Sequence, residues 1–124
     1  MSLFRKKLGQ EGEDRAARFL EKRGYRILER NYHTKAGEID LIAMHEDELV
    51  FVEVKTRTSG AFGAPELAVN PRKQQRMVKA ALGYLKYKNL HQVPCRFDVV
   101  AISNESEKGI EVIPHAFAMD RKGM

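Results

Sequence analysis

The sequence predicts an α/β fold whose elements follow the order α-β-β-β-α-β-β. Two apolar stretches, at residues 39–44 and 49–54, are separated by a short acidic segment, which is typical of a hairpin of buried strands. Helical patterns precede and follow this hairpin, at residues 8–23 and 70–88. Further strand candidates at residues 25–32, 95–102 and 110–113 complete the order.

The first predicted helix carries a carboxylate on its apolar side. Helical periodicity places four small or apolar residues together: Gly9, Ala16, Ala17 and Leu20. Glu13 lies at the centre of this group, so its side chain is expected to face the sheet. A position at the helix margin near solvent, or a pairing with an arginine, is the alternative. Gly24 follows the last helical residue and is a typical helix stop.

Charged residues interrupt both strands of the hairpin. Asp40 lies in the first strand, and Glu53 and Lys55 lie in the second, all among apolar neighbours. Because side chains alternate along a strand, Glu53 and Lys55 share a face with Phe51. Buried charges normally have a partner or bind a metal, so these three residues are candidates for a functional site. Edge positions and simple salt bridges are the alternative interpretation.

The turn of the hairpin determines which of these residues face each other. A two-residue turn at residues 46–47 pairs Asp40 with Glu53, and Glu38 with Lys55, whereas a longer loop would shift this register. Facing Cβ atoms lie only about 5 Å apart, so two carboxylates there repel unless a cation lies between them. All-oxygen ligation indicates Mg²⁺ or Mn²⁺. A simple cross-strand ion pair is an open interpretation of Glu38 and Lys55.

The second predicted helix begins at a clear capping signal, with Asn70 as N-cap and Pro71 at the first helical position. Its predicted apolar stripe consists of Val78, Ala81, Leu82 and Leu85. Four cations lie on the opposite side: Arg72, Arg76, Lys79 and Lys86. This face is a candidate for binding phosphates, and an ordinary solvated face is the alternative. Gln74 projects near the apolar side in the first turn.

Two further segments contain residues that could belong to the functional site. A loop at residues 58–68, rich in glycine and alanine, follows the strand that carries Glu53 and is a candidate rim. The strand predicted at residues 95–102 contains a single aspartate, Asp98, among apolar residues. We expect Asp98 to accept hydrogen bonds or to pair with an arginine, in preference to binding a metal.

The length of the chain favours a single domain spanning residues 1–124. We expect an ordered core at about residues 8–113 and a loose tail at residues 114–124. A single cysteine, Cys95, excludes an intrachain disulfide and a Cys/His zinc site. Apolar runs are too short to span a membrane, and the first residues lack the apolar centre of a signal peptide, so a cytoplasmic location is expected. The net charge of +5 suits a polyanionic partner.

Several motifs of the sequence resemble those of known protein families. Asp40, twelve intervening residues and then Glu53-Val54-Lys55 resemble the D…(D/E)-X-K signature of restriction-endonuclease-like nucleases. Longer strings resemble the YraN family of small bacterial predicted nucleases, which are similar to archaeal Holliday-junction resolvases. These strings are Arg30-Asn31-Tyr32, Gly37-Glu38-Ile39-Asp40-Leu41-Ile42-Ala43 and Phe51-Val52-Glu53-Val54-Lys55-Thr56-Arg57. The resemblance covers about residues 8–102.

The resemblance implies a restriction-endonuclease-like fold, with a mixed central sheet flanked by helices. It implies that Asp40, Glu53 and the Val54 carbonyl hold Mg²⁺ (or Mn²⁺), with help from Glu13, and that Lys55 activates the attacking water. Secondary candidates for this site are Glu38, Lys73 and Gln74. Candidates for binding nucleic acid are Arg57, Arg72, Arg76, Lys79 and Lys86.

The implied activity is metal-dependent hydrolysis of phosphodiester bonds in nucleic acid, with DNA, including branched or junction forms, as the expected partner. A homodimer is also implied, because the similar resolvases act as dimers. The main alternative is a nucleic-acid-binding module that keeps the fold without catalysis. A third interpretation is an interaction domain whose carboxylates form only salt bridges. Metal dependence separates these three.

Overall fold

The helices and strands follow the predicted order. The computed structural model describes residues 3–57, 69–103 and 109–117. The elements are α1 (Leu3–Lys22), β1 (Arg26–His33), β2 (Glu38–His45), β3 (Glu48–Arg57), α2 (Pro71–Tyr87), β4 (Cys95–Ser103) and β5 (Ile110–Phe117). The candidate rim loop at residues 58–68 lies outside the described residues.

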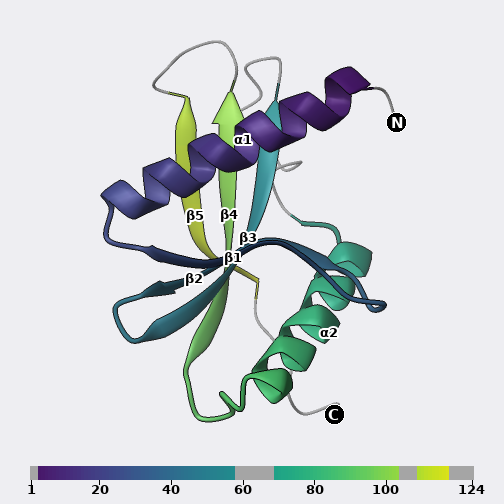
Figure 1. Cartoon of the computed structure of the whole chain (residues 1–124), viewed down its shortest axis with the longest axis vertical. Coiled ribbons are helices and arrows are strands. Elements are labelled where there is room, and N and C mark those ends of the chain that lie inside the picture. Colours follow the sequence, from purple (N-terminus) through teal and green to yellow (C-terminus); the bar gives the residue numbers. More distant parts are fainter. Residues whose placement is uncertain (1–2, 58–68, 104–108, 118–124) are drawn as a thin grey trace.

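The strands form one mixed sheet in the order β1-β2-β3-β4-β5. Neighbouring strands are antiparallel except for β3 and β4, which are parallel and are connected through α2. Figure 1 shows α1 running across the strands on one face of this sheet. A five-stranded mixed sheet with two helices is consistent with the restriction-endonuclease-like fold that the motifs imply.

The β2–β3 hairpin has the predicted register. Its pairs run from His45 opposite Glu48 to Leu41 opposite Val52, so the turn is the expected two-residue turn. The backbone of Glu46 in this turn is left-handed, with φ of +56°. The paired ladder ends at Leu41 and Val52, so the predicted pairs of Asp40 with Glu53 and of Glu38 with Lys55 are not part of it.

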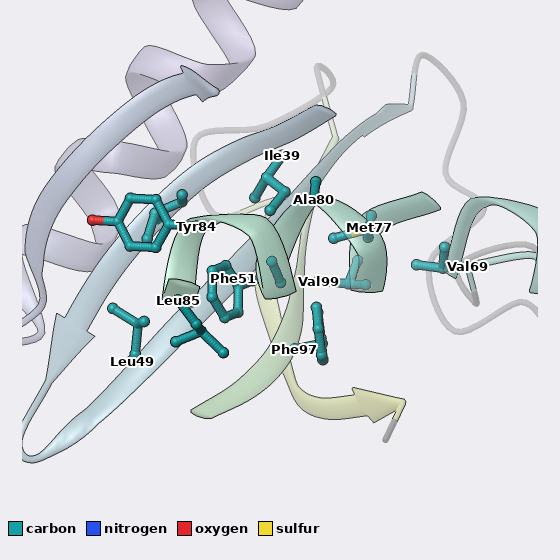
Figure 2. Close-up of a cluster of buried hydrophobic side chains, with 12 residues drawn as sticks. Ile39, Leu49, Phe51, Val69, Met77, Ala80, Tyr84, Leu85, Phe97 and Val99 are labelled. Atoms are coloured by element: carbon teal, nitrogen blue, oxygen red, sulfur yellow. The ribbon is translucent and has the colours of Figure 1, made fainter. Parts of the chain in front are cut away.

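Side chains of β3 alternate between two apolar clusters, one on each face of the sheet. Leu49 and Phe51 belong to the cluster beneath α2, whereas Val50 and Val52 belong to the cluster beneath α1. This alternation confirms that Glu53 and Lys55 share the face of Phe51. Figure 2 shows the cluster beneath α2, in which residues of the helix cover Phe51 and Phe97.

The apolar stripe of α2 differs from the predicted one. Ala81 and Leu85 are buried as expected, but Val78 and Leu82 are only half-buried. Met77, Ala80 and Tyr84 are buried instead, so the stripe is turned around the helix axis. The physical reason is Tyr84, whose ring packs edge-on against Phe51 and Tyr32, with ring centroids 6.2 and 5.2 Å away. The predicted stripe therefore omitted Met77, Ala80 and Tyr84.

The caps of both helices are as predicted. Asn70 accepts a 2.9 Å hydrogen bond from the backbone nitrogen of Lys73, and Pro71 occupies the first position of α2. Gly24 ends α1 with φ of +91°, and the nitrogen of Tyr25 donates back to the Leu20 carbonyl at 3.0 Å. Helix α1 begins at Leu3, earlier than the predicted residue 8. Within the described part of the chain, neither helix is both long and apolar enough to cross a bilayer.

The last strand is longer than predicted. The expected end was residue 113, with a loose tail from Pro114, but β5 continues to Phe117. It is an edge strand, where a proline without a donor is tolerated. The ring of Phe117 stacks on Phe97 with centroids 4.6 Å apart, and this contact holds the end of the strand. Residues 118–124 lie outside the described part.

Alanine at Gly37 and at Gly83 is expected to change the free energy of unfolding in opposite directions. A Cβ at Gly37 would lie 2.7 Å from the carbonyl oxygen of Arg76 in α2, so the helix must move, at a cost of about 1 to 3 kcal/mol. Gly83 is exposed in α2, with nothing within 4 Å of an added Cβ. Alanine there should stabilise the protein by about 0.5 to 1 kcal/mol. Urea titration measures both, and changes of the same sign would contradict this packing.

Candidate metal and nucleic-acid site

Asp40 lies where the β2–β3 ladder ends, and its carboxylate replaces a backbone acceptor. The Val54 backbone nitrogen donates a 2.8 Å hydrogen bond to Asp40 Oδ2. The side chain of Val54 packs in the cluster beneath α1. This bond fastens the first carboxylate of the candidate site to the strand that carries Glu53.

Glu53 is buried in β3, with 4% of its surface exposed. Its Oε1 accepts a hydrogen bond from Nζ of Lys73, which extends from the first turn of α2. The Lys73 side chain is 42% exposed, so the pair links a buried anion to a cation at the surface. A buried carboxylate needs such a partner, because an isolated charge there would be strongly unfavourable.

Glu13 approaches the same region from α1. Its Oε1 is buried and has no hydrogen-bond partner among the described residues. The neighbouring residue, Asp14, pairs with Arg30 of β1, which fixes this part of the helix against the sheet. Gly12 lies so close to β3 that a Cβ there would be 2.5 Å from Thr56 Oγ1. The prediction that Glu13 faces the sheet is therefore confirmed.

The electrostatics relate Asp40 to each of the other two carboxylates. Burial, followed by the charge of Glu53, raises the pKa of Asp40 to about 7, although the Val54 N–H and Lys73 act in the opposite direction. Burial, followed by the charge of Asp40, raises the pKa of Glu13 to about 6. Burial lowers the pKa of Lys73, but its hydrogen bond to Glu53 and the nearby carboxylates outweigh this and raise it. Clustered carboxylates with raised pKa values favour a bound cation.

The donor set fits Mg²⁺ or Mn²⁺, which prefer oxygen ligands. Glu13 supplies a buried carboxylate oxygen without a partner, and Asp40 and Glu53 supply two more carboxylates. However, among the residues that the structure describes, no three His, Cys, Asp or Glu side chains already have a metal-ligating arrangement. Asp40 is directed to a backbone amide and Glu53 to Lys73, so side chains must turn before all three carboxylates can share an ion.

The remaining predicted site residues lie at separate positions on β2, β3 and α2. Lys55 is half-buried on β3, two residues beyond Glu53 and on the same face. Glu38 is exposed and pairs with His33, with Oε2 3.2 Å from Nδ1. Gln74 donates from Nε2 to the Val69 carbonyl at 2.6 Å and so ties the segment before α2 to the helix. Arg57 ends β3, and its side chain lies outside the described part.

A cavity of about 260 Å³ lies beside the Glu53–Lys73 pair. It is lined by Glu38, Asn70, Arg72, Lys73, Arg76 and Met77. Two of the four predicted phosphate-binding cations, Arg72 and Arg76, therefore reach the cavity. The other two, Lys79 and Lys86, are exposed farther along α2 and do not line it. With 1.5 Å per helical residue, the four cations extend over about 21 Å.

Asp98 has the structural role that was expected. Its carboxylate oxygens accept from Arg96 Nε at 3.1 and 3.2 Å, and Oδ1 also accepts from the His115 backbone nitrogen at 3.1 Å. Arg96 further donates to Glu48 at 2.8 Å and to the Tyr25 hydroxyl at 2.9 Å. This network lies at the starts of β3 and β4, away from the end of β3 that carries Lys55.

Replacing Asp98 with alanine is expected to lower the free energy of unfolding by about 3 kcal/mol. The change removes one partner of the half-buried Arg96 and leaves the His115 N–H without an acceptor. If the candidate site binds Mn²⁺, the affinity of the folded variant for Mn²⁺ should be unchanged. Urea titration and calorimetric Mn²⁺ titration test the two statements. An Asp98→Asn protein that folds stably but no longer binds Mn²⁺ would contradict this structural role.

Lys73 contacts Glu53 directly, although the sequence pattern made it only a secondary candidate. A topological signal was available. Parallel pairing of β3 with β4 requires the connecting helix to run back along the sheet, so α2 must begin near the end of β3. A cation in the first turn of that helix lies close to Glu53. The parallel pairing itself could not be deduced from residue patterns.

Comparisons with known proteins give a consistent result. Residues 12–102 match the model of a family described as "Uncharacterised protein family UPF0102". The chain is 52% identical to a UPF0102 protein of Syntrophus aciditrophicus strain SB over 112 residues, which cover 90% of this chain and 88% of that protein. It is 47% identical to the UPF0102 protein of Geobacter metallireducens over 120 residues, covering 96% and 98%. A UPF0102 protein of Moorella thermoacetica is also 47% identical over 120 residues, covering 94% and 100%.

Proposed function

Because this protein belongs to the UPF0102 family and directs three carboxylates to one end of its sheet, we propose that it is a metal-dependent endonuclease. Its substrate in this proposal is nucleic acid, specifically DNA, including branched or junction forms. The family membership confirms the resemblance to the YraN family noted from the motifs. The nuclease activity itself rests on the geometry of the site.

The observation that supports the proposal most strongly is Glu13 Oε1, which is buried, has no hydrogen-bond partner among the described residues and interacts electrostatically with Asp40. A buried carboxylate oxygen without a donor destabilises a fold, and a second carboxylate nearby increases the cost. A divalent cation bound to these carboxylates would give the Glu13 oxygen a partner and would offset the repulsion between the two charges. Asp40, Glu53 and the Val54 carbonyl are the residues that would hold it, with Glu13 as a further donor. In a nuclease such an ion stabilises the negative charge that develops on the phosphate.

In this proposal, Lys55 is the residue that prepares the attacking water. Lys55 follows Glu53 by two residues in β3. Because side chains alternate along a strand, the two side chains project from the same face of the sheet. A positioned ammonium orients the water and favours its deprotonated form. Phosphodiester hydrolysis requires this positioning and charge stabilisation, and it requires no covalent nucleophile from the protein.

The cations of α2 supply the binding surface in this proposal. Arg72 and Arg76 line the cavity beside the carboxylates, and Lys79 and Lys86 continue the basic strip along the helix. A strip of about 21 Å can follow the phosphates of one strand past the carboxylates. Neutralised phosphates supply most of the sequence-independent affinity, so binding should weaken steeply with added salt.

A second candidate function is favoured by one observation. Lys73 already neutralises Glu53 within the protein, as it would in a binding module that keeps the fold without catalysis. Such a module would bind nucleic acid through the basic strip but would need no metal. The unpartnered oxygen of Glu13 argues for the nuclease, because Lys73 does not satisfy it.

The test is cleavage of labelled linear, flapped and four-way-junction DNA with Mg²⁺, Mn²⁺ or EDTA. Lys55→Ala is the catalytic variant, and Lys22→Ala, an exposed lysine at the end of α1, is the matched control. We expect cleavage that requires metal, disappears in Lys55→Ala and persists in Lys22→Ala. Binding without cleavage under every metal would favour the binding module. Neither binding nor cleavage would leave the carboxylates as structural groups.

The resemblance to resolvases extends the proposal to a homodimer working in the cytoplasm. Light scattering on the purified protein, with and without a four-way junction, measures the number of chains directly. A monomer in both conditions would contradict the dimer but leave the chemistry of the site intact.

A further inference from the structure

Lys73 combines a fixed backbone with a side chain that can move. Its backbone nitrogen donates to the Asn70 side chain at the start of α2, which holds the residue at the cap. Its side chain is 42% exposed and reaches Glu53, whose side chain is only 5% exposed. The same lysine also lines the cavity of about 260 Å³. One ammonium group can therefore be placed either on the carboxylate or in the cavity.

The contact with Glu53 conflicts with metal binding. In the proposed nuclease, a divalent ion and the Lys73 ammonium both draw on the Glu53 carboxylate, and two cations at that carboxylate repel each other. Glu53 is buried, so water screens this repulsion poorly. A bound ion therefore favours displacement of the ammonium from Glu53.

We infer that Lys73 is a positioning residue that competes with the metal for Glu53 and moves into the neighbouring cavity when the metal binds. This inference rests on the proposed function. Without metal, the hydrogen bond from Lys73 holds the buried Glu53 carboxylate in place. With metal, its released ammonium joins Arg72 and Arg76 around a phosphate of the substrate next to the cleaved one. Metal binding thereby completes the basic surface.

The cavity is suited to receive the ammonium. Glu38 lines it and attracts a cation, and its charge also contributes to the raised pKa of Lys73. Arg72 and Arg76 would repel a third cation in an empty cavity, but a phosphate between them reverses this effect. The movement is thus expected to be strongest when metal and nucleic acid bind together.

The experiment is calorimetric titration of Mn²⁺ into the full-length protein and three variants. Lys73→Met removes the competing charge, and Lys73→Arg replaces it with a cation that holds carboxylates through two hydrogen bonds. Lys88→Met is the control, because it makes the same charge change at the far end of α2. We expect Lys73→Met to bind Mn²⁺ about 10-fold more tightly, Lys73→Arg about 10-fold more weakly, and Lys88→Met within 2-fold of the unchanged protein.

The opposite directions separate competition from a merely structural role. A lysine that only holds Glu53 in place would weaken Mn²⁺ binding in both variants, and that result would overturn the inference. If the unchanged protein binds Mn²⁺ but Lys73→Met binds no more tightly, the inference fails while the proposed metal site stands. If no protein in the series binds Mn²⁺, both fail.

Thermal unfolding provides a second measurement on the same proteins. In EDTA, Lys73→Met should melt several degrees below the unchanged protein, because Glu53 has lost its partner. Saturating Mn²⁺ should raise its melting temperature more than that of the unchanged protein, since no lysine has to be displaced. An equal or smaller rise would overturn the inference.

Discussion

Replacing Glu53 with glutamine is expected to lower the rate of metal-dependent DNA cleavage by about 1,000-fold, equivalent to about 4 kcal/mol of transition-state stabilisation. The substitution keeps the size of a side chain that is almost fully buried in β3 but removes its charge. It also leaves the Lys73 ammonium without its carboxylate partner. Initial cleavage rates over a range of Mg²⁺ concentrations measure the effect.

Glu111→Gln is the matched control for this prediction. Glu111 is an exposed carboxylate on β5, two strands away from β3, and its replacement should leave the cleavage rate within about 2-fold. The circular dichroism spectra of both variants should match that of the unchanged protein. A folded Glu53→Gln protein with unchanged cleavage would exclude Glu53 as a metal ligand.

Asp40→Asn is expected to stabilise the protein at pH 8 by about 2 to 4 kcal/mol while abolishing metal binding. The pKa of Asp40 rises from 3.8 to about 7 on folding, so the folded protein holds a proton that the unfolded chain releases. Its contribution to stability is complete below about pH 4 and is lost as the pH rises towards 7; each pKa unit is worth about 1.4 kcal/mol. Asparagine removes the charge and keeps an acceptor for the Val54 N–H.

Urea titrations between pH 4 and pH 8 measure this pH dependence in both proteins. The unchanged protein should lose stability over that range more steeply than Asp40→Asn. Asp47→Asn, in the exposed turn of the same hairpin, should follow the unchanged protein. If Asp40→Asn and the unchanged protein show parallel curves, burial does not raise the pKa of Asp40 as described.

Local sequence patterns predicted the β2–β3 hairpin and the start of α2, because interactions between residues close in sequence determine these features. The alternation of side chains and the two-residue turn together brought Asp40 to the end of the ladder near Glu53. The Asn70-Pro71 capping signal placed the start of α2. In each case the interacting residues are close in sequence or joined by a regular repeat.

Contacts between distant segments could not be predicted in the same way. The rotation of the α2 stripe depends on Tyr84 meeting Phe51, and the length of β5 depends on Phe117 meeting Phe97. The contact between Lys73 and Glu53 depends on parallel pairing, for which residue patterns give no direct signal. Tertiary packing decides these features, and propensity does not.

The carboxylate of Asp40 belongs both to the hydrogen bonding of the sheet and to the candidate site. Within the fold it accepts the N–H of Val54, where the β2–β3 ladder has no further pair. An apolar residue at this position would remove a negative charge but would also leave a strand amide without an acceptor. A substitution at position 40 therefore affects both the sheet and the candidate site. Asparagine is the replacement that would preserve the sheet while removing the charge, so the fold does not depend on the metal-binding capacity proposed for this position.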